Sequence, residues 1–176
     1  MIFGDPATFA VEAGAFEDPS LWGGLYLQFR FWIDGQPIGD WEDRIQLTAS
    51  IGYAGSLCET ECCRREWLFH DTSPEDIFQA VYDGFFEYDY TNDPILNPNL
   101  RDRFHVDDIG MGAVEDKYGL VLVGSSTDAE RLIVKDLRKG IFLADVSLPF
   151  GFVESVLNVY IEWGRSQLRA EGERPK

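Results

Sequence analysis

The stretch Leu25–Gly35, LYLQFRFWIDG, is the clearest structural signal in the chain. Its odd-numbered positions up to Ile33 are leucine, phenylalanine or isoleucine, and the positions between them carry tyrosine, glutamine, arginine and tryptophan. This strict period of two predicts a β-strand with one face on a core. Asp34-Gly35 follows directly and predicts a tight turn, as between two antiparallel strands.

Other segments on either side of this strand predict further strands. Gly119–Gly124 is a continuous apolar run, which is typical of a buried strand. Together with the two segments that follow it, and with Lys139-Gly140 as a turn, it predicts an antiparallel meander. The predicted strands besides Leu25–Ile33 are Thr8–Glu12, Ile45–Ile51, Gly119–Gly124, Arg131–Asp136 and Ile141–Leu148.

Two segments predict the main helices. Ser73 can cap a helix, Pro74 suits its first position and Asp76 can complete the capping box, so a helix is expected from there to about Phe86. Residues 151–170 predict an amphipathic helix with its cationic residues near the C-terminus. The sequence therefore predicts an α+β fold: a mostly antiparallel sheet of about five or six strands with two main helices, including a C-terminal amphipathic helix.

The chain of 176 residues is expected to form one domain over residues 1–171, followed by a frayed tail at 172–176. Residues 87–103 are rich in Asn, Asp and Pro and predict an irregular loop. The start of the chain lacks the basic segment of a secretory signal, and no apolar run approaches the roughly 20 residues of a membrane span. These features predict a cytoplasmic protein.

Acidic residues outnumber basic ones by 31 to 15, which gives a formal net charge of −16. Residues 1–70 hold 11 acidic and 4 basic groups (−7), residues 71–116 hold 12 and 2 (−10), and residues 117–176 hold 8 and 9 (+1). Because 45% of the residues are hydrophobic, we expect this charge to lie on the surface of a folded body. Such a surface repels nucleic acid and anionic membranes and attracts a basic partner.

No motif predicts a catalytic residue, a metal or a cofactor. The odd, crowded set Cys58, Cys62 and Cys63 fits a reducing compartment better than a disulfide framework, and it lacks the ligand spacing of a structural zinc site. The arginines that follow it could instead lower a thiol pKa and make a cysteine reactive. His105 stands close to acidic residues and could act as a base, but no nucleophile motif accompanies it.

The most acidic part of the chain also carries interleaved aromatic residues. A helix end with its charged side in water has this composition. A binding surface has it too, because aromatic side chains serve as anchors while carboxylates attract a basic partner. Asp107 and Asp108 can extend the same surface if the loop before them folds back. The residues predicted to contact a partner are Asp83, Glu87, Tyr88, Asp89, Tyr90, Asp93, Asp107 and Asp108.

Three motifs stand near the start of the chain: Met1-Ile2-Phe3-Gly4-Asp5-Pro6, Phe9-Ala10-Val11-Glu12, and the run from Gly24-Leu25-Tyr26 to Ile33-Asp34-Gly35-Gln36-Pro37-Ile38-Gly39-Asp40. Together they resemble the immunity protein 42 family, whose members accompany bacterial polymorphic toxins. The motifs match a strand start, a strand and its turn, so they identify a fold more than a site. The resemblance implies a small cytoplasmic protein that binds a cognate toxin domain and blocks it.

The residues and the resemblance together predict a stoichiometric inhibitor of a cognate protein toxin, which the acidic surface suggests to be basic, such as a nuclease. Nucleic acid and membranes are not expected as partners, and the sequence leaves the oligomeric state open. Two alternatives remain. One is a small hydrolase or metal-binding enzyme that uses His105 and nearby carboxylates, and the other is a module that pairs with itself through a sheet edge or an aromatic patch.

Overall fold

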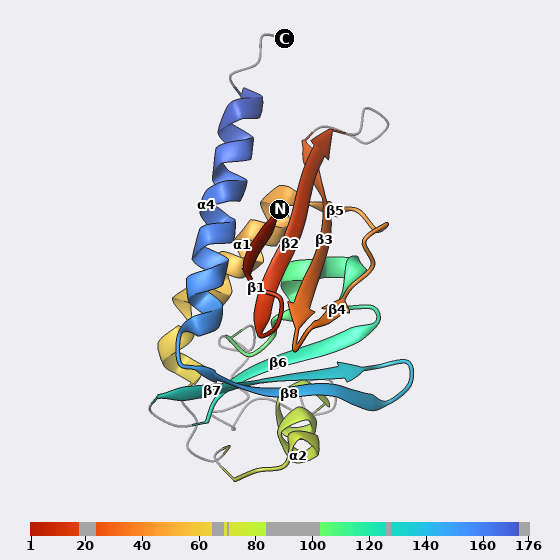
Figure 1. Ribbon diagram of the computed structural model, residues 1–176, viewed down its shortest axis with the longest axis vertical. Helices are drawn as coiled ribbons and strands as arrows, with labels where there is room; N and C mark the ends of the chain where they lie inside the picture. The colour runs from red at the N-terminus through yellow and green to blue at the C-terminus, as the bar shows by residue number, and fades with distance from the viewer. Residues whose placement is uncertain (18–23, 65–68, 70, 84–102, 126–127, 173–176) are drawn as a thin grey trace, which may run out of the picture.

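The computed structural model describes residues 1–17, 24–64, 69, 71–83, 103–125 and 128–172. Within them, eight strands form two antiparallel sheets (Figure 1). The first sheet contains β1 (Ile2–Asp5), β2 (Phe9–Glu17), β3 (Leu25–Ile33), β4 (Gln36–Ile38) and β5 (Ile45–Gln46). The second contains β6 (Tyr118–Gly124), β7 (Ala129–Asp136) and β8 (Ile141–Pro149). The helical elements are α1 (Leu47–Glu59), η1 (Glu61–Arg64), α2 (Pro74–Phe78), η3 (Gln79–Asp83), η5 (Asp107–Ala113) and α4 (Phe152–Gly172).

Strand β3 organises the first sheet and has the predicted bounds and the predicted alternation of buried and partly exposed residues. It pairs along its whole length with β2, which is longer than the strand predicted there, and on its other side with β4 and β5. Asp34 and Gly35 both have positive φ angles, 50° and 74°. They form the predicted two-residue turn, because positive φ at both positions matches the twist of the flanking strands.

The second sheet is the predicted meander, in the order β6-β7-β8. Its strands run across one end of the first sheet rather than along it (Figure 1). The apolar run of β6 has two buried faces: Leu120 and Leu122 join the main core, and Val121 and Val123 join a second core on the other side. A strand buried on both faces needs no polar alternation, which explains its composition.

The C-terminal helix α4 packs along the first sheet beside α1 (Figure 1). Val153, Val156, Leu157 and Tyr160 are buried at the spacing of one helix face, as predicted. The helix continues two residues past the predicted end at 170, so Gly172 belongs to it. The expected tail at 173–176 lies outside the described residues.

The prediction of a strand over Ile45–Ile51 was wrong beyond Gln46, because helix α1 begins at Leu47. The alternating pattern over seven residues resembles a strand. Over the longer span to Glu59, however, the buried residues are Leu47, Ser50, Ala54 and Leu57, which have helical spacing. The fold is α+β as predicted, but its strands are divided between two sheets and α1 is a main helix that the sequence analysis missed.

The helix predicted from Ser73 begins as expected. The Ser73 side chain accepts a hydrogen bond from the Asp76 backbone N–H at 3.1 Å, and Pro74 occupies the first helical position. The α-helix ends at Phe78 and continues as the wider π-helical turn η3 to Asp83. The predicted end at Phe86 and most of the predicted loop at 87–103 lie outside the described residues.

Candidate functional site

The α2–η3 element leads into residues 83–102, here called the acidic segment. Aromatic contacts fix this element on the second sheet. Phe78 stacks on Tyr82, with 4.6 Å between ring centroids, and meets Phe142 of β8 edge-on at 5.7 Å. Gly119 of β6 makes room for these rings, since a Cβ atom at this position would stand 2.5 Å from Phe78. This packing forms the second core and fixes the orientation of the helix that precedes the segment.

Arg131 of β7 fastens the start of the same element. Its Nη1 donates to the Thr72 carbonyl at 2.8 Å, just before the Ser73 cap. Its Nε and Nη2 donate to the two carboxylate oxygens of Asp145 on β8, at 3.1 and 2.6 Å. This two-point ion pair holds the guanidinium in one orientation, so the sheet carries a rigid support for α2.

The two ends of the acidic segment lie close together in the structure. Tyr82, one residue before Asp83, has its ring 5.2 Å from the ring of His105. The backbone of Asp83 closes η3, and Asp107 and Asp108 open η5 on the returning side. Of the predicted contact residues, Glu87, Tyr88, Asp89, Tyr90 and Asp93 lie outside the described residues.

Asp107 and Asp108 have different environments. Asp107 is only 2% exposed and accepts a hydrogen bond from the Leu120 backbone N–H at 3.3 Å. Its carboxylate therefore has almost no surface to offer a partner; it holds η5 against β6. Burial raises the pKa of Asp107 well above its usual value, and the neighbouring charge of Asp108 raises it further. Asp108 is half-buried and retains some surface.

The geometry around His105 does not provide a catalytic pair. Its Nδ1 lies 3.8 Å from the Asp107 carboxylate, beyond hydrogen-bonding distance. Within the described ranges, no group of three histidine, cysteine or acidic side chains could hold a metal ion. The same residues contain no helix long and apolar enough to cross a membrane.

The reactive-cysteine alternative is not supported at Cys58. Burial raises its thiol pKa to about 11, and the nearby positive charge of Arg64 only partly opposes this. Arg64 itself is fully buried, pairs with Glu154 of α4, and donates to the Leu57 carbonyl at 2.7 Å and to the Arg103 carbonyl at 3.2 Å. It joins α1, α4 and the chain returning from the acidic segment.

Sequence reasoning missed this buried charge cluster. Besides Arg64 and Glu154, it includes Glu130 of β7, whose carboxylate accepts from the backbone N–H groups of Val153 and Gly151 at the start of α4. Carboxylates stabilise a helix N-terminus because its N–H groups point outward with partial positive charge. No local pattern reveals such a cap, since its residues come from distant parts of the chain.

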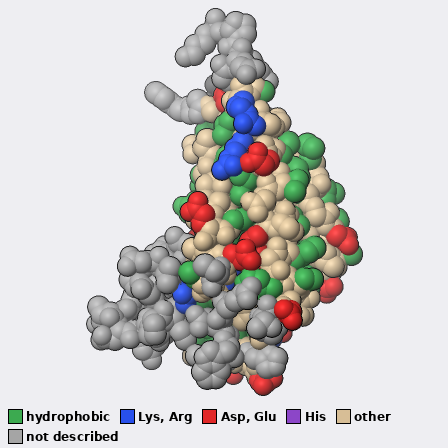
Figure 2. Space-filling view, turned by 90° about the vertical axis from the view of Figure 1, so that its left-hand side faces the viewer, with side chains coloured by type: hydrophobic (Ala, Val, Ile, Leu, Met, Phe, Trp, Pro, Cys, Tyr) green, Lys and Arg blue, Asp and Glu red, His purple; other side chains and the backbone are tan. Residues whose placement is uncertain are grey.

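Many cations in the described part of the chain are paired with acids. Lys117, for example, lies 3.0 Å from both Asp40 and Asp43. Figure 2 shows a patch of basic side chains near the C-terminal end of α4. In this helix Arg165 pairs with Glu162 at 2.7 Å. Because acids outnumber bases by 31 to 15, this pairing leaves a large excess of carboxylate.

The described residues form an α+β fold of two antiparallel sheets with a long C-terminal helix. The model of the family described as immunity protein 42 matches residues 1–163, and the chain belongs to this family. It is therefore an immunity protein, a non-enzymatic inhibitor that binds and neutralises a cognate toxin.

A solved structure supports the fold. The crystal structure of CdiI from Burkholderia dolosa AUO158 matches with a TM-score of 0.66 and 19% sequence identity, covering 93% of this chain and 99% of that one. At this identity, the likeness concerns the fold alone. No curated protein matches the chain.

Proposed function

We propose that the chain neutralises its toxin by forming a 1:1 complex in the cytoplasm, and that the toxin is a basic protein, with a nuclease as the first candidate. The observation that carries this proposal is the net charge of −10 on residues 71–116, within a chain of net charge −16. Nucleases must bind polyanions and so present basic surfaces. An acidic inhibitor matches such a surface in charge and can occupy it.

The proposed contact surface is the acidic segment that follows η3, with Asp83, Glu87, Tyr88, Asp89, Tyr90 and Asp93, together with Asp108 on the returning side. Two features support this assignment. The helix leading into the segment is fixed on the second sheet, and the contact between Tyr82 and His105 brings its two flanks together. Asp107 has a different role in this proposal, because its buried carboxylate positions the backbone of η5.

The two residue types in this surface have separate effects on binding. Carboxylates attract a basic protein over a distance and can raise association rates from about 10⁵–10⁶ to as much as 10⁸–10⁹ M⁻¹s⁻¹ at low salt. Tyrosine side chains bury a large area with few rotatable bonds and so slow dissociation. The complex should therefore form more slowly as salt is added, while its dissociation rate changes less.

The test compares two triple charge reversals. One variant carries Glu87→Lys, Asp89→Lys and Asp93→Lys. The control carries lysine at Glu59 of α1 and at Glu162 and Glu171 of α4. It changes the net charge of the chain by the same amount as the first variant. A candidate toxin domain is taken from the product of the gene immediately upstream. Binding to it is measured by biolayer interferometry at several salt concentrations, together with rescue of growth on co-expression.

The proposal predicts that the first variant loses fast association and growth rescue, and that the control keeps most of both. Equal losses in both variants would mean that total charge matters and the segment does not. Unchanged binding by the first variant would exclude the segment as the interface. Assay of the toxin on DNA and RNA tests the nuclease assignment. Titration of that activity with the chain tests the 1:1 stoichiometry, because inhibition should be complete at one equivalent.

A further inference from the structure

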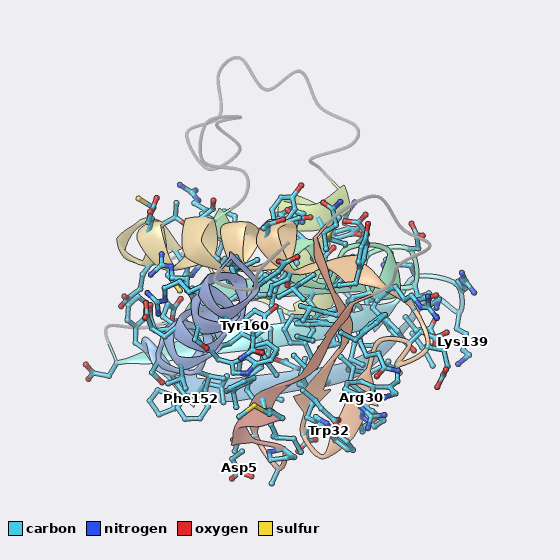
Figure 3. The ribbon with its side chains drawn as sticks, turned by 90° about the horizontal axis from the view of Figure 1, so that it is seen from above. Asp5, Arg30, Trp32, Lys139, Phe152 and Tyr160 are labelled. Carbon is cyan, nitrogen blue, oxygen red and sulfur yellow. The ribbon has the colours of Figure 1, made fainter. Side chains whose placement is uncertain are left out.

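The outer face of the first sheet carries a second concentration of aromatic side chains. Among the described residues, the helical elements that pack most closely on this sheet are α1, α4 and η5, and they meet the side that holds the main core. The opposite side presents the alternate residues of β3, which are all partly exposed: Tyr26, Gln28, Arg30 and Trp32. Figure 3 shows Arg30 and Trp32 on the side of the sheet that faces away from α1.

Arg30 stands between two tryptophan rings at the centre of this face. Its guanidinium carbon lies 4.9 Å from the ring centroid of Trp32 and 5.1 Å from that of Trp41, which follows β4 in the chain. Trp41 reaches over the sheet above Gly14, where an added Cβ atom would stand 3.9 Å from its ring. This is an ordinary van der Waals distance, so the Trp41 ring packs directly on β2 at this position.

Glu12 holds the cluster in place. One carboxylate oxygen accepts from the Arg30 Nε and from the Trp32 indole N–H, both at 2.7 Å. Burial alone would raise the pKa of Glu12, but the hydrogen bonds from Arg30 and Trp32 outweigh it and lower the pKa. The carboxylate is thus charged at neutral pH and balances the arginine.

This arrangement leaves binding groups on the surface. Among the described residues, none accepts a hydrogen bond from the terminal Nη groups of Arg30, whose side chain is 27% exposed. The two rings and the guanidinium are already held in position, so less conformational entropy is lost when they meet a partner. Tryptophan, tyrosine and arginine are also the residue types that dominate the energy of protein interfaces.

The loops around this face carry an excess of acid. Asp34 directly follows β3, and Asp40, Glu42 and Asp43 flank Trp41 in the chain. The Asp40 and Asp43 side chains are 46% and 45% exposed. Lys117 lies 3.0 Å from both Asp40 and Asp43, and Arg44 follows Asp43 in the chain. An aromatic centre with a net negative rim is complementary to a basic protein that presents apolar side chains and backbone carbonyls.

We propose that this aromatic face, defined by Glu12, Arg30, Trp32 and Trp41 with the acidic loops around it, is a second contact surface for the toxin. This inference rests on the proposed function. It adds short-range binding energy at the aromatic face to the charge steering and the tyrosine anchors of the acidic segment. The toxin would pack an apolar residue against the outer side of the tryptophan rings and accept hydrogen bonds from Arg30 through its backbone.

The test uses two variants of the full chain and one control. Trp41→Ala removes an anchor that lies in a loop, and Gln28→Arg adds a positive charge to the face while leaving the tryptophans in place. Tyr53→Ala is the control, because Tyr53 is a 43% exposed aromatic residue on α1, on the other side of the sheet. Toxin affinity is measured by calorimetry, folding by thermal melting, and the mass of the chain alone by light scattering.

We expect Trp41→Ala to weaken toxin binding by about tenfold or more, in line with an interface anchor. Gln28→Arg should weaken it as well without a change in melting temperature, and Tyr53→Ala should stay close to the wild type. If Trp41→Ala fails to fold, Gln28→Arg decides. Wild-type affinity in a folded Gln28→Arg variant overturns the inference and leaves the proposed function intact.

Two further outcomes also count against it. If the wild-type chain is a dimer that Gln28→Arg converts to a monomer, a second copy of the chain occupies the face. If the wild-type chain does not bind the toxin, the proposed function itself fails, and this inference fails with it.

Discussion

A buried hydrogen-bond chain joins three elements of the main core and allows a quantitative test of the structure. Ser50 of α1 donates to the Ile109 carbonyl of η5 at 2.8 Å, and its oxygen lies 2.7 Å from the Tyr160 hydroxyl of α4. Because a serine hydroxyl has one hydrogen, Tyr160 must donate to Ser50. Burial raises the pKa of Tyr160 far above its usual value, so this proton stays in place at all ordinary pH values.

The two ends of this chain should respond differently to substitution. Tyr160→Phe keeps the ring and removes one hydrogen bond, which costs about 1 kcal/mol. Ser50→Ala leaves both the Tyr160 hydroxyl and the Ile109 carbonyl buried without a partner, and each unsatisfied group costs about 1–3 kcal/mol. We therefore expect Ser50→Ala to lower the free energy of unfolding by about 2–6 kcal/mol.

The double variant provides the decisive comparison. With Tyr160→Phe present, Ser50→Ala no longer leaves a hydroxyl unsatisfied, so the double variant should cost less than the sum of the single ones by about 1 kcal/mol or more. Urea unfolding at pH 7 measures all four proteins. Tyr53→Phe and Ser166→Ala on exposed positions are the controls and should change stability by less than about 0.5 kcal/mol. Additive effects, or a Ser50→Ala cost no larger than that of Tyr160→Phe, would refute the reasoning.

Three further predictions test other features. Burial raises the pKa of Asp107 in the folded chain, so the native state holds the carboxyl proton more tightly, and the free energy of unfolding falls as pH rises above the unfolded-state pKa near 3.8. Asp107→Asn should remove this fall and give a more stable protein at neutral pH. Parallel profiles of stability against pH for the two proteins would contradict the prediction. An added methyl group at Gly52 on α1 meets open space, so Gly52→Ala should raise the free energy of unfolding by about 0.5–1 kcal/mol. Gly164→Ala on α4 would place a Cβ atom 2.6 Å from Ile51 of α1 and should lower the melting temperature. Equal effects of the two substitutions would contradict the packing of α1 on α4. Because its thiol pKa is about 11, Cys58 should be alkylated at pH 8 at about one tenth of the rate of free cysteine or less. Mass spectrometry of the peptide that contains Cys58 measures this rate. Alkylation as fast as that of a free thiol would contradict the burial of Cys58.

Part of the candidate site could be predicted from the sequence. The acid-rich composition and the Ser73 cap identify the segment and the helix leading into it, because charge and capping are local properties. The burial of Asp107 could not be predicted, since it depends on the Leu120 backbone of a strand that follows η5. The aromatic face was missed for the same reason: Glu12, Arg30 and Trp41 come from three separate segments.

The elements with a local signal could be predicted from the amino-acid sequence. The alternation in β3, the turn at Asp34-Gly35 and the meander from β6 to β8 follow from side-chain periodicity and backbone sterics, which act over a few residues. The division of the strands into two sheets and the helix from Leu47 onward became evident only from the folded chain. The burial of Arg64 and Glu130 likewise could not be predicted from the sequence. These outcomes depend on which apolar faces meet and which charges find partners, and both are set by contacts between residues far apart in the chain.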